Sequence, residues 1–215
     1  MKDTLRINEI FLSIQGESTF AGWPCVIVRT TGCPLRCSWC DTKYAYDEGT
    51  DMPLAEVVER AVSFGVRHVE VTGGEPLAQP LVPALLRALC DKGKTVLLET
   101  SGAIDISSVD ERVHVIMDIK CPDSGMTDRM RLENISLLKA KDEVKFVLAS
   151  RGDYEFARRI VREYGLPERC TVLFSTSFDL MDRKSVVEWM LEDRLPVRFR
   201  LQMHKFIWAP DQRGV

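Results

Sequence analysis

Apolar segments of strand length alternate with amphipathic segments along most of the sequence. The predicted strands cover residues 6–14, 25–30, 68–72, 95–99, 113–119, 143–148, 171–175 and 197–202. The predicted helices cover residues 54–64, 81–90, 153–164 and 185–191. Gly65 and Gly165 follow two of these helices, at the position where glycine commonly ends a helix. Strands that are apolar throughout, with helices between them, indicate a parallel sheet covered on its faces.

The length limits how such a sheet can be arranged. The chain has 215 residues, which suits a single domain over residues 1–215. A closed eight-unit β/α barrel usually needs ~250 residues, and this chain also spends residues on a cysteine-containing loop. We therefore predict an α/β fold, an incomplete and open β/α barrel of about six units. We expect the first two strands to be an N-terminal extension of it.

Short polar motifs fall where the predicted strands end. The loop Cys33–Thr42 follows the strand over residues 25–30, and the motif Thr-Gly-Gly-Glu-Pro follows the strand that ends at residue 72. Glu-Thr-Ser-Gly at residues 99–102 and Asp-Ile-Lys at residues 118–120 follow two further strands. In parallel α/β folds, catalytic groups lie at the carboxyl ends of the strands. These motifs therefore predict one shared site.

Composition excludes several classes of function. The net charge is −3 and there is no basic run, so direct nucleic-acid binding is not expected. No apolar run approaches the length of a membrane span. The first ten residues, MKDTLRINEI, contain acidic side chains and no apolar core of a secretory signal. We expect a cytoplasmic protein without a membrane or nucleic-acid partner.

Three of the seven cysteines lie together in the sequence CPLRCSWCDT, as Cys33, Cys37 and Cys40. In a cytosolic chain, clustered cysteines point to metal or redox chemistry more often than to disulfides. Four-iron clusters are usually held by four thiolates, so three would leave one iron open. An open coordination position is typical of a catalytic metal centre. The alternative is a structural zinc site completed by Cys25, although Cys25 lies in a predicted strand.

The cysteine spacing resembles that of the radical S-adenosylmethionine (SAM) superfamily. The resemblance rests on Cys-x3-Cys-x2-Cys, on Trp39 before the last cysteine, and on the later Gly-Gly-Glu-Pro at residues 73–76. It implies a [4Fe-4S] cluster whose open iron is chelated by SAM. One electron delivered to that cluster then cleaves SAM and gives a 5′-deoxyadenosyl radical. It also implies a one-electron reductant such as flavodoxin or ferredoxin.

Motifs outside the cysteine loop resemble one family, the 7-carboxy-7-deazaguanine synthases. They are Glu-Ile-Phe at residues 9–11, Ser-Ile-Gln-Gly-Glu-Ser at residues 13–18, and the tail Gln-Met-His-Lys-Phe-Ile-Trp at residues 202–208. The resemblance implies ring contraction of 6-carboxy-5,6,7,8-tetrahydropterin to 7-carboxy-7-deazaguanine with loss of ammonia, a Mg²⁺ requirement and a homodimer. An alternative with the same cysteine loop is an activating enzyme that makes a glycyl radical on a protein partner. Phe11, Phe206, Ile207 and Trp208 could form a dimer surface or belong to the core.

The resemblance assigns cofactor and metal positions. Cys33, Cys37 and Cys40 would hold the cluster, and Thr42 would bind Mg²⁺ through its hydroxyl, although a turn-capping role is the alternative. The positions that would contact SAM are Trp39, Cys40, Asp41, Gly74, Asp118, Ile119, Lys120 and Ser175.

The same resemblance assigns positions that would contact the substrate: Ile14, Gln15, Gly16, Glu17, Arg29, Thr72, His204 and Val215. The Gln15 amide offers both a donor and an acceptor to a pterin edge, and Glu17 can accept from amino groups. Arg29 offers a planar fork to a carboxylate, or it forms a surface salt bridge. His204 is either a substrate contact or a satisfied core histidine.

Overall fold

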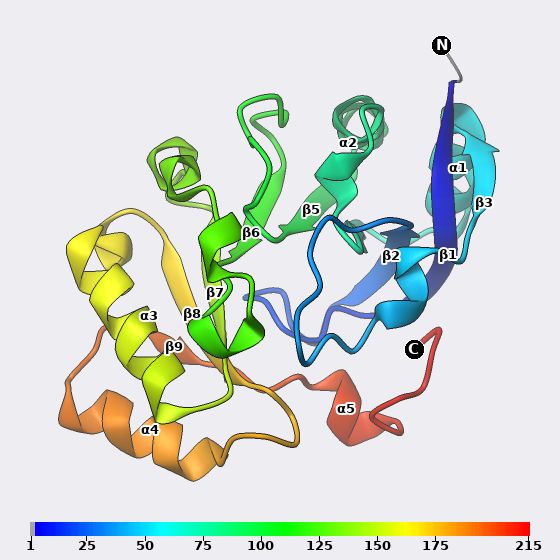
Figure 1. The fold of residues 1–215 in the computed structure, drawn as a ribbon. Coiled ribbons are helices and arrows are strands. Elements are labelled where there is room, and N and C mark those ends of the chain that lie inside the picture. Colours follow the sequence, from blue (N-terminus) through cyan, green and yellow to red (C-terminus); the bar gives the residue numbers. More distant parts are fainter. Residues whose placement is uncertain (1–2) are drawn as a thin grey trace.

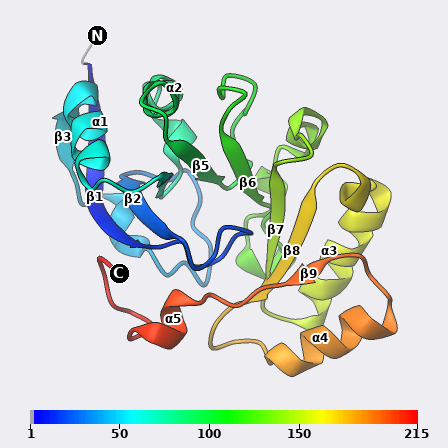
Figure 2. The same ribbon diagram turned by 180° about the vertical axis from the view of Figure 1, so that it is seen from behind.

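The fold is built on one nine-stranded sheet, in the order β3-β1-β2-β4-β5-β6-β7-β8-β9 (Figures 1 and 2). It is seen in a computed structural model that describes residues 3–215, so Met1 and Lys2 of the predicted domain lie outside the described residues. The strands are β1 (Thr4–Ile14), β2 (Pro24–Thr30), β3 (Thr50–Pro53), β4 (His68–Gly73), β5 (Thr95–Thr100), β6 (His114–Asp118), β7 (Glu143–Leu148), β8 (Thr171–Thr176) and β9 (Arg198–Phe199).

The direction of the strands confirms the predicted open β/α barrel. β2, β4, β5, β6, β7, β8 and β9 are parallel neighbours, and β1 is antiparallel to both β2 and β3. The two end strands, β3 and β9, do not pair with each other, so the sheet curves without closing (Figure 1). The N-terminal extension consists of β1 and β3, whereas β2 is the first strand of the parallel part.

Four helices cover the outer face of the curved sheet: α1 (Leu54–Ser63), α2 (Val82–Asp91), α3 (Arg151–Glu163) and α4 (Arg183–Glu192) (Figures 1 and 2). The α3 helix begins at Ser150, whose hydroxyl accepts from the Asp153 N–H at 3.2 Å. The α4 helix begins at Asp182, whose carboxylate accepts from the Ser185 N–H at 2.9 Å. Within residues 3–215, no helix has the length and apolar character needed to cross a membrane.

The structure adds one strand to the sequence prediction and shortens another. β3 (Thr50–Pro53) was not predicted, and it pairs with the start of β1. The connection from β6 to β7, where no helix was predicted, contains three short 3₁₀ helices, Pro122–Ser124, Thr127–Arg129 and Leu132–Leu137. The last strand, predicted over residues 197–202, is limited to Arg198–Phe199. It ends there because the chain turns away from β8: the Met203 N–H donates to the Gly16 carbonyl at 2.9 Å. A short helix, α5 (His204–Ile207), follows.

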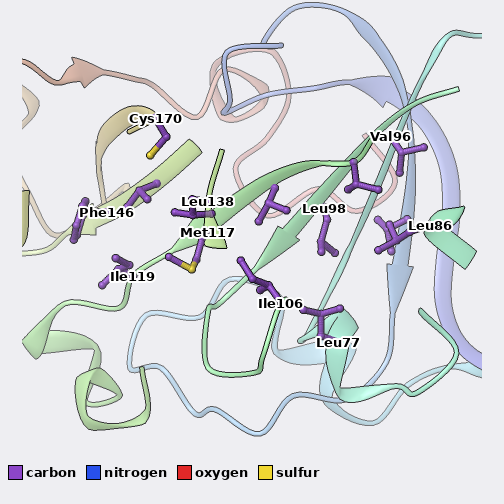
Figure 3. Packing of buried hydrophobic residues seen from close by; sticks show 14 of the residues in the cluster. Leu77, Leu86, Val96, Leu98, Ile106, Met117, Ile119, Leu138, Phe146 and Cys170 are labelled. Atoms are coloured by element: carbon purple, nitrogen blue, oxygen red, sulfur yellow. The ribbon is translucent and has the colours of Figure 1, made fainter. Parts of the chain in front are cut away.

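The main core lies between the sheet and the helices (Figure 3). Leu98, Met117 and Phe146 project from neighbouring strands into this core and are almost fully buried. Leu86 of α2 packs in the same cluster. Burying a side chain of this size contributes roughly 1.5–3 kcal/mol to the free energy of folding. This outer core is therefore a main source of the stability of the fold.

A separate segment covers the amino end of the barrel. It runs between β1 and β2, and the Phe20 ring packs edge-on against His68 at 5.6 Å and His114 at 5.0 Å between ring centroids. Both histidines begin their strands, so they lie at the edge of the sheet opposite the cysteine loop. The Thr19 hydroxyl and N–H bond the Glu143 carboxylate at the start of β7. Any cavity inside the barrel therefore opens toward the carboxyl ends of the strands.

Candidate active site

The inner face of the sheet carries charged side chains at alternate positions. Because side chains along a strand point to opposite faces in turn, residues two apart share a face. Arg29 on β2 pairs with Thr72 on β4, and Asp118 on β6 pairs with Lys145 on β7. With Glu99 on β5, these residues line a cavity of about 270 Å³ at the carboxyl end of the barrel. The strands are therefore apolar along their outer face, whereas their inner face is charged toward the carboxyl ends.

The cysteine loop forms one wall of this cavity. Cys33, Cys37 and Cys40 are free thiols, each partly exposed, and all three line the cavity. The loop follows the carboxyl end of β2 and is anchored by the Gly32 N–H, which donates to the Ala45 carbonyl at 2.8 Å. Burial raises the pKa of the Cys33 and Cys37 thiols. A positively charged metal centre would reverse that effect, because a coordinated thiol is deprotonated.

Cys25 is far from the other three cysteines in the fold. It is fully buried near the amino end of β2, where it packs with Ile27, Leu97 and Ile116 inside the barrel. The cysteine loop begins beyond Thr30, at the other end of the same strand. Five residues of extended strand span ~16 Å, so Cys25 cannot share a metal ion with the loop. Within residues 3–215 no group of three His, Cys, Asp or Glu side chains is placed to hold a single metal ion.

The end of β4 lies directly against the cysteine loop, and this contact requires glycine. A Cβ on Gly74 would overlap the Gly32 carbonyl oxygen and approach the Cys33 Cβ at 2.8 Å. The next residue, Glu75, is fully buried and accepts hydrogen bonds from Thr100 at 2.9 Å and from the Ser101 N–H at 2.7 Å. The Gly-Gly-Glu motif thus joins the loops after β2, β4 and β5 around one edge of the cavity.

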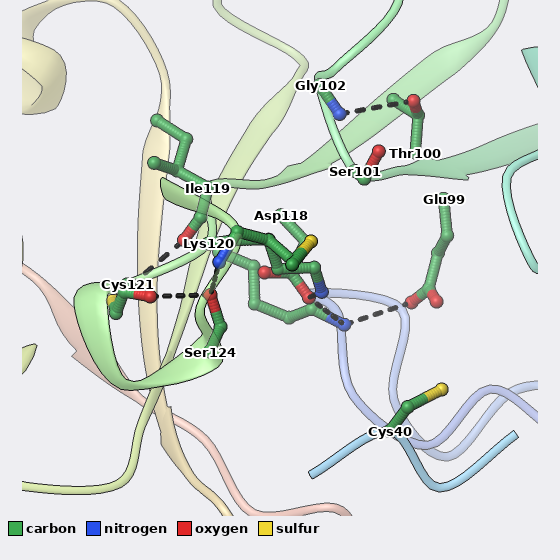
Figure 4. A network of polar contacts seen from close by, with 12 residues as sticks. Cys40, Glu99, Thr100, Ser101, Gly102, Asp118, Ile119, Lys120, Cys121 and Ser124 are labelled. Atoms are coloured by element: carbon green, nitrogen blue, oxygen red, sulfur yellow. Dashed lines mark hydrogen bonds and ion pairs between the residues drawn. The ribbon is translucent and has the colours of Figure 1, made fainter. Parts of the chain in front are cut away.

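Polar side chains from β5 and β6 face the cysteine loop across the cavity (Figure 4). Lys120 pairs with Asp118, with 2.8 Å between the ammonium and the carboxylate. Burial disfavours the Lys120 ammonium, but Asp118 and the Cys37 thiolate outweigh burial and raise the Lys120 pKa. Ile119, between them, is buried in the outer core, so only its backbone is available to a ligand. Ser175 is buried without a hydrogen-bond partner for its hydroxyl, and it does not line the cavity.

The remaining cofactor and metal positions of the cysteine loop also line the cavity. They are Trp39, Asp41 and Thr42. The Thr42 hydroxyl lies 3.7 Å from the Cys40 sulfur. Asp41 pairs with Lys205 of α5 at 2.8 Å, which links the cysteine loop to the C-terminal segment. Thr42 precedes the short 3₁₀ helix Lys43–Tyr46, but its side chain makes no capping hydrogen bond there.

A buried ammonium group connects the two sides of the cavity. Lys145 lies 2.7 Å from Glu17, 3.6 Å from Glu99 and 3.9 Å from Asp118. Burial disfavours its charge, but the three carboxylates outweigh burial and raise the pKa of Lys145. Burial likewise opposes ionisation of Glu17, and the Lys145 ammonium overcomes this and lowers the Glu17 pKa. Glu17 is therefore a permanent hydrogen-bond acceptor at the cavity wall.

Gln15 is used within the protein itself. Its side-chain oxygen accepts from the Glu17 N–H at 2.9 Å and the Ser18 N–H at 2.8 Å, and its NH₂ group donates to Glu70 at 2.9 Å. Only 2% of Gln15 is exposed. Its amide therefore shapes the turn that carries Glu17, and the neighbouring Ile14 and Gly16 line the cavity beside it.

Arg29 forms an ion pair and also faces the cavity. Its Nε lies 2.7 Å from Glu9, and its side chain is 15% exposed. The Tyr44 hydroxyl donates to the same Glu9 carboxylate at 3.1 Å. The ion pair fixes the plane of the guanidinium, which lines the cavity next to Thr72. An oriented guanidinium is suited to binding a carboxylate group.

The C-terminal segment closes part of the cavity mouth. Gln202 donates to Glu17 at 3.0 Å, and the His204 ring packs so closely on Gly16 that a Cβ there would overlap it. Arg213 lies 3.6 Å above the Tyr44 ring and pairs with Glu48 at 2.9 Å. The last residue, Val215, lines the cavity as well. Segments from both ends of the chain thus meet at one site (Figure 2).

The sequence prediction missed two charged residues of the inner face, Glu70 and Lys145, whereas Glu99 was placed at the site as part of the Glu-Thr-Ser-Gly motif. The signal was present, because each is a charged residue inside an otherwise apolar strand, at the spacing that places it on the inner face. The prediction treated these strands as buried on both sides, and so it gave their charged residues no role.

Comparison with known proteins identifies the family. The model of the radical SAM superfamily matches residues 27–179. A 7-carboxy-7-deazaguanine synthase from Chlorobaculum tepidum is 48% identical over 214 residues, which cover 98% of this chain and 97% of the relative. Another from Koribacter versatilis is 43% identical over 229 residues and covers 98% of this chain and all of the relative. The chain belongs to the 7-carboxy-7-deazaguanine synthase family.

Solved structures of other proteins show the same fold. The crystal structure of QueE from Escherichia coli aligns with a TM-score of 0.78, at 22% identity, over 94% of this chain and 95% of that one. Streptococcus suis SuiB, solved with S-adenosylmethionine bound, aligns with a TM-score of 0.52 at 15% identity, over 78% of this chain and 44% of that one. The predicted family and fold are both confirmed, and this 7-carboxy-7-deazaguanine synthase family member is a radical SAM enzyme.

Membership of the superfamily implies a [4Fe-4S] cluster and SAM, and the residues present fit both. Three free thiols on one loop face the cavity, and Cys25, which could have blocked a fourth coordination position, lies at the other end of β2. The Gly74 backbone leaves space beside Cys33 that a side chain would fill. When bound, the cluster and SAM together supply an organic radical that abstracts hydrogen.

Proposed function

We propose that this protein converts 6-carboxy-5,6,7,8-tetrahydropterin to 7-carboxy-7-deazaguanine with loss of ammonia. The observation that carries the proposal is that one cavity contains the three cysteine thiols and, within the same walls, charged groups matched to a carboxylated aminopterin. The named relatives cover the whole length of the chain, which supports the same assignment. We also propose that residues 1–215 act as one catalytic domain.

The residues of the cavity divide into two groups in this proposal. Cys33, Cys37 and Cys40 hold the cluster. The segment Trp39–Asp41, Gly74, the turn Asp118–Lys120 and Ser175 form the SAM side. Of these, Ile119 acts through its backbone, and Ser175 is on the inner face of β8 beside Val147 but does not itself line the cavity.

The opposite side of the cavity binds the pterin. Arg29 binds the substrate carboxylate, and Glu17 accepts from N–H groups of the ring. Thr72, His204 and Val215 close the wall around the ring. The turn Ile14–Gly16 presents its backbone, since the Gln15 oxygen is already occupied.

The direct test is anaerobic turnover. Reconstituted protein is incubated with SAM, Mg²⁺, a reduced flavodoxin or ferredoxin and 6-carboxytetrahydropterin, and the deazaguanine acid and ammonia are measured in equal amounts. Product is expected only with cluster-loaded protein. SAM cleavage without any pterin product would overturn the proposal and favour an enzyme that activates a protein partner. A colourless protein with zinc in place of iron would overturn both the ring contraction and the alternative of an activating enzyme.

Magnesium is part of the proposal, and Thr42 is its expected ligand. A hydroxyl oxygen at the cavity wall suits a hard cation that keeps several waters. Thr42→Val should keep the iron content and raise the Mg²⁺ concentration for half-maximal activity by roughly tenfold, the lower end of the loss seen for weakened metal sites. Thr171→Val, at the amino end of β8, serves as the matched control. An unchanged Mg²⁺ response in Thr42→Val would remove this residue from the metal site.

We propose a cytoplasmic homodimer. Phe206 and Ile207 on α5 are more than half exposed, which supports a subunit contact there, whereas Phe11 lines the cavity and Trp208 is half-buried. Light scattering after size-exclusion chromatography would decide the assembly state. Phe206→Ser with Ile207→Ser should shift a dimer toward monomer without altering iron content.

A further inference from the structure

The Glu70 carboxyl group lies at the bottom of the cavity and is not among the residues proposed to contact SAM or the substrate. Glu70 is on β4, two residues before Thr72, and it lines the cavity although only 5% of it is exposed. Its neighbours in the sheet at the same level are Ile27 on β2 and Leu97 on β5. Both are apolar and face the barrel interior. Glu70 therefore lies one layer below the charged residues, in an apolar ring.

The contacts of Glu70 differ from those of the other carboxyl groups in the cavity. Lys145 approaches Glu17, Glu99 and Asp118, but no ion pair joins Lys145 to Glu70 among the described residues. The side-chain hydrogen bond of Glu70 is to the neutral Gln15 amide. With several carboxyl groups around one ammonium, the group without a cationic partner is the one that keeps a proton.

The charges around Glu70 support the same conclusion. Burial comes first, and the Glu99 carboxylate adds to it; together they raise the pKa of Glu70 to about 8, with a further contribution from Glu17. The Gln15 hydrogen bond and, less strongly, Lys145 act in the opposite direction but do not outweigh burial and Glu99. Two groups of β2 also act near Glu70. Cys25 is neutral because burial raises its pKa, and the Arg29 guanidinium, which favours the charged form of Glu70, is paired with Glu9 at 2.7 Å.

Gln15 determines which oxygen of Glu70 carries the proton. The Gln15 oxygen faces two backbone N–H groups, which can only donate, so the NH₂ group must be the end that faces Glu70. The Glu70 Oε2 atom, 2.9 Å away, is therefore an acceptor. A neutral carboxyl group has one acceptor oxygen and one hydroxyl. The hydroxyl is Oε1, the oxygen that Gln15 leaves free on a side chain that lines the cavity.

We propose that Glu70 is a further substrate-contacting residue, whose Oε1 hydroxyl donates a hydrogen bond to an acceptor nitrogen or carbonyl oxygen of a bicyclic aminopyrimidinone. The proposal rests on the proposed function for the identity of that ligand. Glu17 and Glu70 then have complementary roles set by their surroundings: Glu17, ionised beside Lys145, accepts hydrogen bonds, and Glu70 donates one. A ligand ring that contacts both residues must therefore offer N–H donors to Glu17 and an acceptor atom to Glu70.

The first experiment measures binding without turnover. The probe is 7-carboxy-7-deazaguanine, titrated calorimetrically into the anaerobic, cluster-loaded full-length protein between pH 6.5 and 9 with no reductant. With a pKa of about 8, the wild-type affinity should fall about tenfold from pH 7 to pH 9, because the donor form is lost. Glu70→Gln has the shape and hydrogen-bonding pattern of the protonated acid, so it should bind as tightly as wild type at pH 7 and show no such fall.

Two further variants separate hydrogen bonding from packing. Glu70→Met removes the donor and keeps the volume, so it should weaken binding about tenfold at pH 7, a typical result of leaving a buried partner without its hydrogen bond. Glu143→Gln changes another buried carboxyl group that does not line the cavity, and it should keep the wild-type pH dependence. A pH profile of Glu70→Gln that matches wild type, or full affinity in Glu70→Met, would overturn the proposal.

The second experiment does not depend on the ligand. If the folded protein holds a proton on Glu70 that the unfolded chain releases near its ordinary pKa of 4.5, stability falls as the pH rises from about 4.5 to 8. Denaturant midpoints of Glu70→Gln should therefore rise relative to wild type over this range. Equal pH responses would overturn the protonation of Glu70. If the probe does not bind wild-type protein at all, the proposed function fails, and these midpoints still decide the state of Glu70.

Discussion

Along β4, Val71 packs into the core beneath the helices, whereas Glu70 and Thr72 on either side of it face the cavity. The same alternation holds on β7, where Phe146 lies in the core and Lys145 lies in the cavity. The outer face of the sheet stabilises the fold by burying apolar side chains. The inner face holds charged side chains, which are costly to bury unless they have ion-pair or hydrogen-bond partners. Substitutions on the two faces should therefore have separable effects.

The largest effect on activity is expected for the cysteine loop, which lines the cavity at the inner face of the sheet. Cys37→Ser should abolish iron binding and all product formation, because three thiols are the fewest that hold the cluster in this loop. Folding should persist, since the side chain is partly exposed. Iron and sulfide analysis with circular dichroism tests this. Cys90→Ser on α2, a thiol outside the cavity, should retain its iron. A Cys37→Ser protein with a full cluster would contradict the assignment.

The outer face should show the opposite behaviour. Phe146→Ala removes a fully buried ring that packs edge-on against Phe174 at 5.5 Å. Such truncations cost about 3–5 kcal/mol of unfolding free energy. Denaturant titration measures this loss, and kcat per folded, cluster-loaded molecule should not change. A large fall in kcat at low temperature, where the variant remains folded, would show that the two faces are coupled.

On the inner face, Lys145→Met should change chemistry as well as stability. Without the ammonium, Glu17 loses the partner that lowers its pKa, while burial still raises it, so Glu17 takes up a proton more readily as the pH falls. The substrate KM should rise roughly tenfold to a hundredfold, the range expected for one charged hydrogen bond, and more strongly at acid pH. Lys145→Arg should recover part of the loss. A uniform fall in kcat with an unchanged KM would contradict this role.

The smallest effect is expected at the cavity mouth. Arg213→Ala removes an exposed ion pair with Glu48 and a contact with the Tyr44 ring. Exposed contacts of this kind are weak, so the substrate KM should rise only roughly twofold to fivefold, with little change in stability. A C-terminal extension beyond Val215 should raise KM further while SAM cleavage persists. Normal KM values for both proteins would leave the tail without a role in binding.

The sequence predicted the outer face and the loops better than the inner face. Helix and strand positions followed from apolar periodicity, and the cysteine loop and Gly-Gly-Glu-Pro followed from spacing. Glu70 and Lys145 were missed because their strands were interpreted as buried on both faces, and the partners that give these charges a role come from other strands. Ile119 and Ser175 were predicted from a motif position. Only the fold shows that the Ile119 side chain points into the outer core, and that Ser175, next to Val147 in the sheet, does not line the cavity.

The form of the connection after β6 could not be predicted for another reason. No helix was predicted there, and Pro122 and Gly125 favour short turns, but the sequence does not show how those turns contact the cysteine loop. The Ser124 hydroxyl bonds back to the Cys121 carbonyl at 2.6 Å, and the Ser38 N–H donates to the Ser124 carbonyl at 3.1 Å. These turns lie beside the cysteine loop, so a regular helix in this position would displace it.

The meeting of Gly16 with Met203 and His204 has a consequence for biosynthesis. A nascent chain emerges from the ribosome at about 5–20 residues per second, with its N-terminal part first. Its cysteine loop and the strands around it have been synthesised while residues 202–215 are still being made. Chains that are truncated or stalled late in translation would therefore contain the three cysteines proposed to hold the cluster but lack one wall of the cavity.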